Sequence, residues 1–287
     1  MNAREMTTAL GGSWHGRYGM VRCPAHDDRE PSLSISDGVT SILVKCFAGC
    51  DTAAVLSALR ARFGRDNPVS IAAPEPINPS DPRVVAARKV WHDALAPEGT
   101  LVATYLERRR ITLPIPKAIR FAPQLFHVKH MAPLPAMVAA VTDLDGHVTG
   151  VHQTFLDDDG NKAPVIPVKV MTGRFGNGAV RLGEPEDGVL AIAEGIETAL
   201  SAMQLYGGVV WAACGSRLAS VAVPPGVRVV ELYADNGAPG IEAARKAALR
   251  IGAAGLEDRV LFPPGSCGDW NDALVACHGV ATAGGSP

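Results

Sequence analysis

Residues 189–201 constrain the fold of this chain more than any other stretch. Small and β-branched apolar residues at 189–193 end on Glu194, Gly195 follows, and apolar residues then recur with helical spacing. A buried strand that ends on a carboxylate and turns at glycine into a helix places the acid at the carboxyl end of a sheet. Open α/β sheets bind their ligands at that edge. The sequence therefore predicts a ligand site around Glu194.

The same order recurs later in the chain. Residues 227–234 read as a second strand that ends on Asp235, and a turn rich in glycine and proline leads into a helix over residues 241–251. Further strands are predicted over residues 209–213 and 260–262, each followed by a short helix. Repeated strand–helix units indicate a parallel sheet with helices packed on its faces.

Three acids follow strands of this predicted sheet, namely Glu194, Asp235 and Asp269. Like charges packed closely repel one another unless a cation neutralises them. Oxygen ligands favour Mg²⁺ or Mn²⁺ over zinc, and these ions commonly hold phosphate oxygens. Each acid alone could equally cap a helix or order a turn. Together they predict a magnesium or manganese site.

Two short clusters near the N-terminus predict a second metal site, for zinc. The first pair of candidate ligands is separated from the second by residues 31–45, which alternate around an Asp-Gly turn and predict a hairpin. Zinc favours four such ligands in a tetrahedral arrangement. The predicted ligands are Cys23, His26, Cys46 and Cys50. The alternative is a hairpin with unrelated buried cysteines and a surface histidine. Asp27 and Asp28 are interpreted as solvated turn residues.

Charge restricts how this chain could bind nucleic acid. The formal net charge is −2 and the pI is about 6.4, so any such contact must come from local basic patches. Three arginines share a predicted helix over residues 104–111, and further basic residues flank a hairpin predicted over residues 137–156. The candidates are Arg108, Arg109, Arg110, Lys162, Lys169 and Arg174. A solvated helix face is the alternative interpretation of the arginine run.

Composition divides the chain. Five prolines within residues 67–82 predict a linker. We predict an N-terminal module over residues 1–65, a linker over 66–82, an α+β middle region over 83–185 and an α/β region over 186–287. Six cysteines, no long apolar run and no signal-peptide pattern predict a cytoplasmic protein that contacts no membrane. Cys214, Cys267 and Cys277 are expected to be small buried residues or free thiols.

The motifs resemble those of a known family. EGIETALSA, the turn at residues 235–240 and GDWND at 268–272 are similar to the Toprim domain shared by bacterial-type primases and topoisomerases. CPAHDDREPSLSISDG and VKCFAGC resemble the zinc-binding domain of phage and plasmid versions of these primases, and the middle region resembles the segment that precedes their Toprim domain. The resemblance implies a Toprim-like parallel sheet, preceded by an α+β region and a small zinc-ribbon-like β module.

It also implies an activity. A DNA primase of a mobile element would make short RNA primers on single-stranded DNA from nucleoside triphosphates, by metal-dependent nucleotidyl transfer. Glu194 would act near the attacking hydroxyl or help to hold Mg²⁺ or Mn²⁺, and Asp235 would be a metal ligand. The zinc module would help to recognise the template. Because no nucleoside-triphosphatase loop is present, a replicative helicase on a separate chain is an expected partner.

One position departs from the family pattern. Gly237 stands where the family has the second aspartate of an Asp-x-Asp pair, so a carboxylate is missing. Asp269, Asp272 and Glu197 could compensate in part. The departure keeps two alternatives open: a catalytically impaired nucleic-acid-binding replication accessory and, with less support, a Toprim nuclease.

Overall fold

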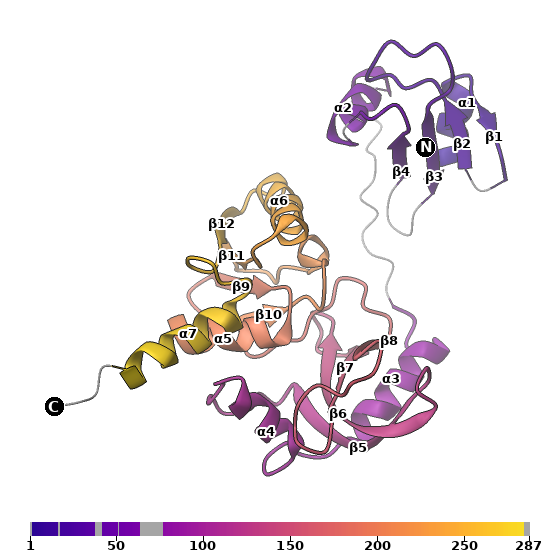
Figure 1. Cartoon of the computed structure of the whole chain (residues 1–287). Helices are drawn as coiled ribbons and strands as arrows, with labels where there is room; N and C mark the ends of the chain where they lie inside the picture. The colour runs from indigo at the N-terminus through magenta and orange to yellow at the C-terminus, as the bar shows by residue number, and fades with distance from the viewer. Residues whose placement is uncertain (1, 17, 38–41, 51, 64–76, 284–287) are drawn as a thin grey trace. The chain divides into compact units, whose positions relative to one another are not determined.

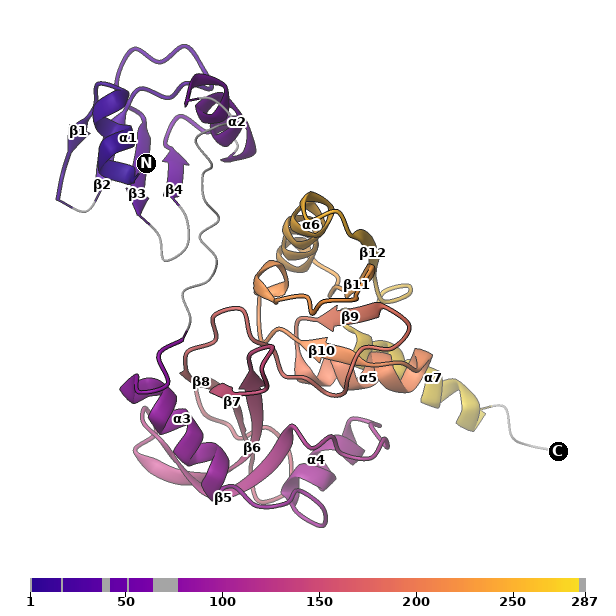
Figure 2. The same ribbon diagram turned by 180° about the vertical axis from the view of Figure 1, so that it is seen from behind.

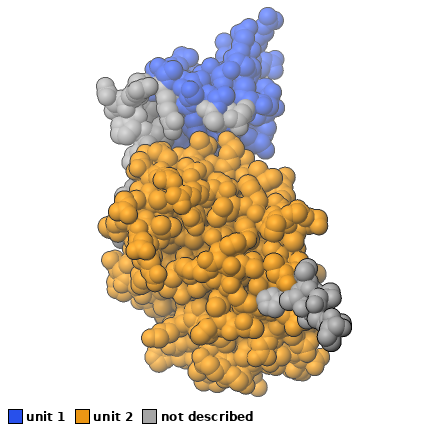
Figure 3. All heavy atoms as spheres, turned by 90° about the vertical axis from the view of Figure 1, so that its left-hand side faces the viewer, with its two compact units in different colours: residues 1–76 blue, residues 77–287 orange. Residues whose placement is uncertain are grey.

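A computed structural model describes residues 2–16, 18–37, 42–50, 52–63 and 77–283. The chain forms two compact units, residues 1–76 and 77–287, coloured blue and orange in Figure 3. Most of the predicted linker, residues 66–82, lies outside the described residues. None of the described helices is long and apolar enough to cross a membrane.

The N-terminal unit is a small antiparallel sheet with two helices. Its elements are α1 (Ala3–Ala9), β1 (Ser13–Trp14), β2 (Tyr18–Val21), β3 (Leu33–Asp37), β4 (Ile42–Cys46) and α2 (Thr52–Phe63), with the strands in chain order. Leu33 and Ile35 are fully buried, whereas Ser34 and Ser36, which alternate with them, are only half-buried. This period of two fixes which face of β3 enters the core. The predicted hairpin is confirmed as the β3–β4 pair.

The middle region is an antiparallel sheet with two helices. Its elements are α3 (Pro82–Asp93), α4 (Leu101–Arg108), β5 (Ile119–His127), β6 (Ala132–Thr142), β7 (Val148–Phe155) and β8 (Lys169–Gly173). The predicted hairpin with its Asp-Gly turn is confirmed as β6–β7. Strand β5 escaped prediction because Pro123 and a register shift between Ala122 and Leu125 interrupt its alternation.

Helix α4 differs from its predicted bounds. Thr100 caps its start, so the helix begins before residue 104. Arg110 adopts a left-handed conformation with φ of 61°, and the amide of Ile111 bonds back to the carbonyl of Leu106. The helix therefore ends at Arg108, and the three successive arginines do not share one helical face.

The C-terminal region is the predicted parallel sheet. Its elements are β9 (Val189–Ala193), α5 (Ile196–Tyr206), β10 (Val210–Ala212), the short 3-10 helix η1 (Leu218–Ser220), β11 (Val229–Tyr233), α6 (Ala238–Ala253), β12 (Glu257–Leu261) and α7 (Trp270–Ala283). All strand pairs are parallel, in the order β10-β9-β11-β12. Helices α5 and α7 cover one face of the sheet and α6 covers the other (Figures 1 and 2).

The middle and C-terminal regions share a core. Along β6, Val138 packs with Ala87 of α3, while Met137 and Ala139 on the opposite face belong to a cluster that contains Leu200 of α5. Both faces of β6 are therefore buried, one by α3 and the other by α4 together with the C-terminal region. This packing brings α4 and β8 against the start of α5, where the predicted acids lie.

Candidate metal and nucleotide site

Glu194 directly follows β9, and Asp235 lies two residues beyond the end of the adjacent parallel strand β11. Strand β9 pairs with β11 so that Ala193 lies opposite Tyr233, which brings the two following segments to the same edge of the sheet. Glu194 Oε1 is buried and has no hydrogen-bond partner among the described residues. A Cβ atom on Gly240 would lie 3.2 Å from this oxygen and would overlap the backbone of Asp235. The glycine thus lets the start of α6 approach the carboxylate closely.

The environment disfavours charge on both carboxyls. Burial raises the pKa of Glu194. Burial, together with the charges of Glu194 and Asp269, raises the pKa of Asp235 to about 6, although the Thr198 hydroxyl donates to its Oδ1 at 3.3 Å. A bound cation would relieve this repulsion and would give the unpartnered oxygen of Glu194 a ligand role. These residues therefore fit a divalent cation.

Asp269 is held beside Asp235 by a dense set of backbone contacts. The Asn236 amide donates to the Gly268 carbonyl at 2.8 Å, and the Trp270 indole donates to the Ala234 carbonyl at 3.1 Å. The Oδ1 atom of Asp269 also accepts the Asp272 amide at 2.8 Å and so caps α7. Asp269 thus combines a capping role with its position near the acids.

The three acids are more widely spaced than a closed metal site. Among the described residues, only two groups of three or more candidate ligands have all their ligand atoms within 4.8 Å of one another, and neither contains Glu194, Asp235 or Asp269. One of the two groups is the exposed turn at Asp143, Asp145 and His147. The three acids therefore do not form a closed set of ligands by themselves.

Gly237 does more than omit a carboxylate. Its φ is 120° and its ψ 157°, a conformation that is essentially restricted to glycine. A Cβ atom here would meet no atom closer than Pro239 Cδ at 4.0 Å, so there is space for a side chain. The obstacle is the backbone conformation, which strains any residue other than glycine. An aspartate at this position would require a different turn between β11 and α6.

Glu197 is the main site residue whose role the sequence does not reveal. It is buried in the first turn of α5 and accepts the Tyr105 hydroxyl at 2.6 Å and the Lys169 ammonium at 3.0 Å, with Lys162 at 3.8 Å. Burial alone would raise the pKa of Glu197, but Lys169, Tyr105 and Lys162 hold it well below its usual range. From its helical position the sequence suggested only that Glu197 could compensate for the carboxylate missing at position 237. Its actual partners could not be foreseen, because they lie far away in the sequence.

Lys162 and Lys169 therefore lie beside the acidic edge. The charge of Asp269 acts on Lys162, and that of Lys169 acts on Asp235. His152 lies on β7, the strand that pairs with β8, and its Nδ1 atom is buried without a hydrogen-bond partner among the described residues. Burial and the charge of Lys169 lower the pKa of His152 to about 4, so this ring is neutral at pH 7.

The other predicted basic residues are distributed differently. Arg109 bonds Asn271 Oδ1 at 3.1 Å, and Arg108 bonds Asn161 Oδ1 at 3.0 Å. Arg110 is exposed. Arg174 donates to Asp81 at 2.8 Å, at the start of α3. The structure thus gathers Lys162 and Lys169 at the acidic edge and ties Arg174 to the cap of another helix.

The predicted zinc ligands converge in the N-terminal unit. All four ligand atoms lie within 4.8 Å of one another, and His26 Nδ1 lies 3.1 Å from Cys50 Sγ and 4.0 Å from Cys46 Sγ. Zinc–thiolate and zinc–imidazole bonds of about 2.0–2.3 Å in a tetrahedron require similar spacings. The cluster is a Cys3His metal-binding site, and its donors fit zinc.

The expectation for Asp28 is wrong. Its side chain is nearly buried, and its Oδ2 accepts the Cys23 amide at 2.6 Å and the Ser32 hydroxyl at 2.5 Å. Its Oδ1 lies 3.6 Å from Nε2 of His26, the ring nitrogen opposite the ligand atom. These bonds hold the pKa of the Asp28 carboxyl below its ordinary value. Asp28 is thus a structural partner of the metal cluster, whereas Asp27 is exposed.

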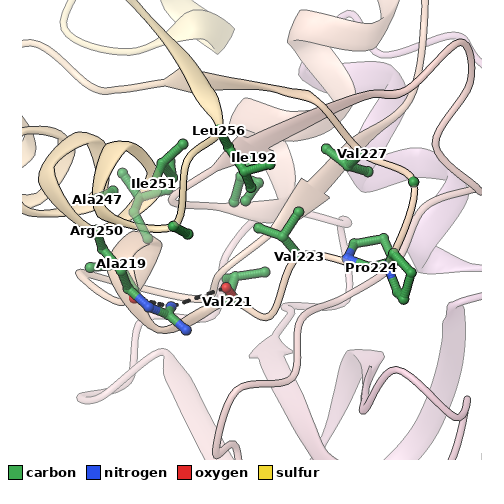
Figure 4. Close-up of a pocket in the computed structure, with 14 residues that line it drawn as sticks. Ile192, Ala219, Val221, Val223, Pro224, Val227, Ala247, Arg250, Ile251 and Leu256 are labelled. Carbon is green, nitrogen blue, oxygen red and sulfur yellow. Dashed lines mark hydrogen bonds between the residues drawn. The ribbon is translucent and has the colours of Figure 1, made fainter. Parts of the chain in front are cut away.

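A cavity of about 340 Å³ opens on the other side of the sheet, between α6 and the segment around η1 (Figure 4). Its lining is aliphatic apart from Arg250, whose guanidinium donates to the carbonyls of Ala219 and Val221. No carboxylate lines this cavity. It therefore lacks the groups that would hold a metal and is separate from the acidic edge.

Comparisons with known proteins agree with this arrangement. Residues 189–279 match the family described as Toprim domain, and residues 82–182 match a domain of unknown function (DUF7146). No curated protein matches the chain.

Similar solved structures include the zinc-binding and RNA polymerase domains of the Aquifex aeolicus primase, with 14% identity, a TM-score of 0.48 and coverage of 99% of this chain and 83% of that one. The primase fragment of the bacteriophage T7 primase-helicase protein has 14% identity and a TM-score of 0.43, with coverage of 92% of this chain and 98% of that one.

Proposed function

We propose that this chain, which carries a Toprim domain over residues 189–279, is a DNA primase that joins ribonucleotides on single-stranded DNA. The observation that carries the proposal is the buried, unpartnered oxygen of Glu194 beside Asp235, whose pKa is raised to about 6. Such a pair is costly unless a cation is bound. Nucleotidyl transfer by divalent cations is the chemistry that open carboxylate sites of this kind support.

The chain's own residues would divide the work. Glu194 and Asp235 would hold Mg²⁺ or Mn²⁺, with Asp269 as a more distant acid. When bound, the metal supplies charge stabilisation to phosphate oxygens and orients the attacking hydroxyl. The Thr198 hydroxyl fixes the rotamer of Asp235 through its bond to Oδ1. Lys162 and Lys169, beside these acids, would contact the phosphates of the nucleotide or the template.

The N-terminal unit would present the template. With zinc in the Cys3His cluster, the small sheet would hold a fixed surface for single-stranded DNA, while Arg108, Arg109, Arg110 and Arg174 would add phosphate contacts elsewhere. We further propose that the protein works in the cytoplasm for a mobile element and receives template from a helicase on a separate chain.

Primer synthesis on single-stranded DNA tests the proposal. The full chain, loaded with zinc, should extend labelled ribonucleotides in Mg²⁺ or Mn²⁺, and Glu194→Gln should lose that product. Glu242→Gln is the matched control, because Glu242 lies on the exposed face of α6 with Arg245 and Lys246. Absence of primers from the wild-type chain with either cation would refute primase activity.

Gly237 supports a second candidate, a binding protein with an impaired site. In that case the wild-type chain would bind single-stranded DNA but make no primer. Gly237→Asp is a poor rescue variant, because φ of 120° at this position favours glycine. Template cleavage in the same assay would instead identify a Toprim nuclease.

A further inference from the structure

Glu197 joins the two matched regions of the larger unit. It lies in the first turn of α5, three residues after Glu194, yet its partners all come from the middle region. Tyr105 belongs to α4, Lys162 to the loop before β8 and Lys169 to the start of β8. One buried anion thus collects two ammonium groups and a phenol from three separate elements.

The two lysine side chains are only partly buried. Their side chains are 34% and 37% exposed, whereas that of Glu197 is 7% exposed. The cluster therefore buries its anion and leaves its cations in reach of solvent. His152 is neutral at pH 7, so two lysines face one glutamate, and Arg109 adds a further positive charge that acts on Lys162; positive charge is therefore in excess. This excess faces the acidic edge, where Asp269 acts on Lys162.

A purely structural role explains this arrangement poorly. A buried ion pair contributes little net stability compared with apolar residues of similar size. Two long side chains that were free of Glu197 would repel each other and gain rotamer freedom in solvent. The shared carboxylate suppresses both effects, because it hydrogen-bonds Lys169 at 3.0 Å through one oxygen and pairs with Lys162 at 3.8 Å through the other.

We propose that Glu197 is a positioning residue that holds Lys162 and Lys169 beside the carboxylate site, where they contact the triphosphate of the incoming nucleotide. The proposal rests on the proposed function for the identity of that ligand. Glu197 itself does not touch the substrate. Its effect passes through the two lysines, so it should alter nucleotide binding without altering the acids that hold the metal.

The first experiment measures the lysines directly. Wild-type protein and Glu197→Gln are treated with acetic anhydride, without nucleotide, and acetylation of each lysine is followed by mass spectrometry. Loss of the paired charge should raise labelling of Lys162 and Lys169 several-fold and leave the exposed Lys129 unchanged. The matched control is Gln204→Ala, because Gln204 also ties α5 to the middle region, accepting the Thr112 amide at 2.7 Å and donating to the Arg110 carbonyl, and hydrogen-bonds no lysine among the described residues.

The second experiment measures ligand binding. Mg·ATP should protect both lysines in the wild-type chain. Glu197→Gln should bind it about tenfold or more weakly, since hydrogen bonds to charged groups are stronger than those between neutral groups. Glu197→Asp, which keeps the charge, should recover part of the affinity. The thermal transition of each variant shows whether it is folded.

The outcomes separate the two claims. Labelling that is unchanged in Glu197→Gln, or raised equally in Gln204→Ala, would overturn the positioning role. Wild-type protein that binds no Mg·ATP would overturn the proposed function and the triphosphate role with it, while the labelling result would still decide whether Glu197 holds the lysines.

Discussion

Replacement of Asp235 by asparagine should stabilise the metal-free protein. The pKa of Asp235 is raised from its ordinary 3.8 to about 6, first by burial and then by Glu194 and Asp269. Asparagine keeps the acceptor for the Thr198 hydroxyl and removes the charge. If each pKa unit corresponds to about 1.4 kcal/mol, the upper limit of the gain is about 3 kcal/mol. Solvent screening of this partly exposed group reduces that to about 1–2 kcal/mol.

The pH dependence of the gain follows from the sign of the shift. An acid with a raised folded-state pKa binds more protons in the native than in the unfolded state between pH 4 and pH 6. The wild-type chain should therefore lose stability as pH rises through this window, and Asp235→Asn should lose less, because only the raised pKa of Glu194 remains in the variant. The difference should be full at pH 8 and near zero at pH 4.

Intrinsic tryptophan fluorescence on heating provides the assay, because Trp91, Trp211 and Trp270 lie in the larger unit. A gain of about 1–2 kcal/mol should raise the midpoint at pH 8 by about 3–6 °C. Millimolar Mg²⁺ should raise the wild-type midpoint and narrow the difference. An equal gain at pH 4 and pH 8, or a variant that is less stable at pH 8, would refute this account of the site.

Three further changes test other parts of the structure. Asp28→Asn should weaken zinc binding about 10–100-fold in a chelator competition, and the exposed Asp27 changed to asparagine should leave it unchanged. Gly237→Ala should lower the free energy of unfolding by about 1–3 kcal/mol in denaturant titrations, since φ is 120°. Asn271→Ala should lower the free energy of unfolding by about 1–3 kcal/mol in the same titrations, because the buried Asn271 bonds both Arg109 and Ser201. For either Gly237→Ala or Asn271→Ala, an unchanged free energy of unfolding would contradict the prediction.

The sequence predicted the parallel sheet well because its signals are local. Strand β9 of small and β-branched residues is followed by glycine and then by helical spacing, so β9 and α5 can be predicted from one stretch of chain. Strand β12 is only partly buried and begins at Glu257, before the predicted start at residue 260. The Cys3His cluster was predictable for the same reason, because a hairpin brings together pairs that are close in sequence.

The contacts that escaped prediction are long-range or conformational. Nothing near Glu197 in the sequence indicates that Tyr105 and Lys169 bind it, because packing of the two regions creates the contact. Asp28 was misjudged because an aspartate in a turn looks the same whether its oxygens meet water or the Cys23 amide. The left-handed conformation of Arg110, which splits the arginine run, likewise carries no sequence signal.

The core shared by the middle and C-terminal regions limits how freely either region can be exchanged. A chain cut between residues 182 and 189 would expose the apolar face formed by Met137 and Ala139. It would also leave the buried carboxylate of Glu197 without its lysines. The two segments that match separate families are therefore expected to unfold in a single step and to be inherited as one piece. A Toprim segment from another protein would function here only together with its own preceding sheet.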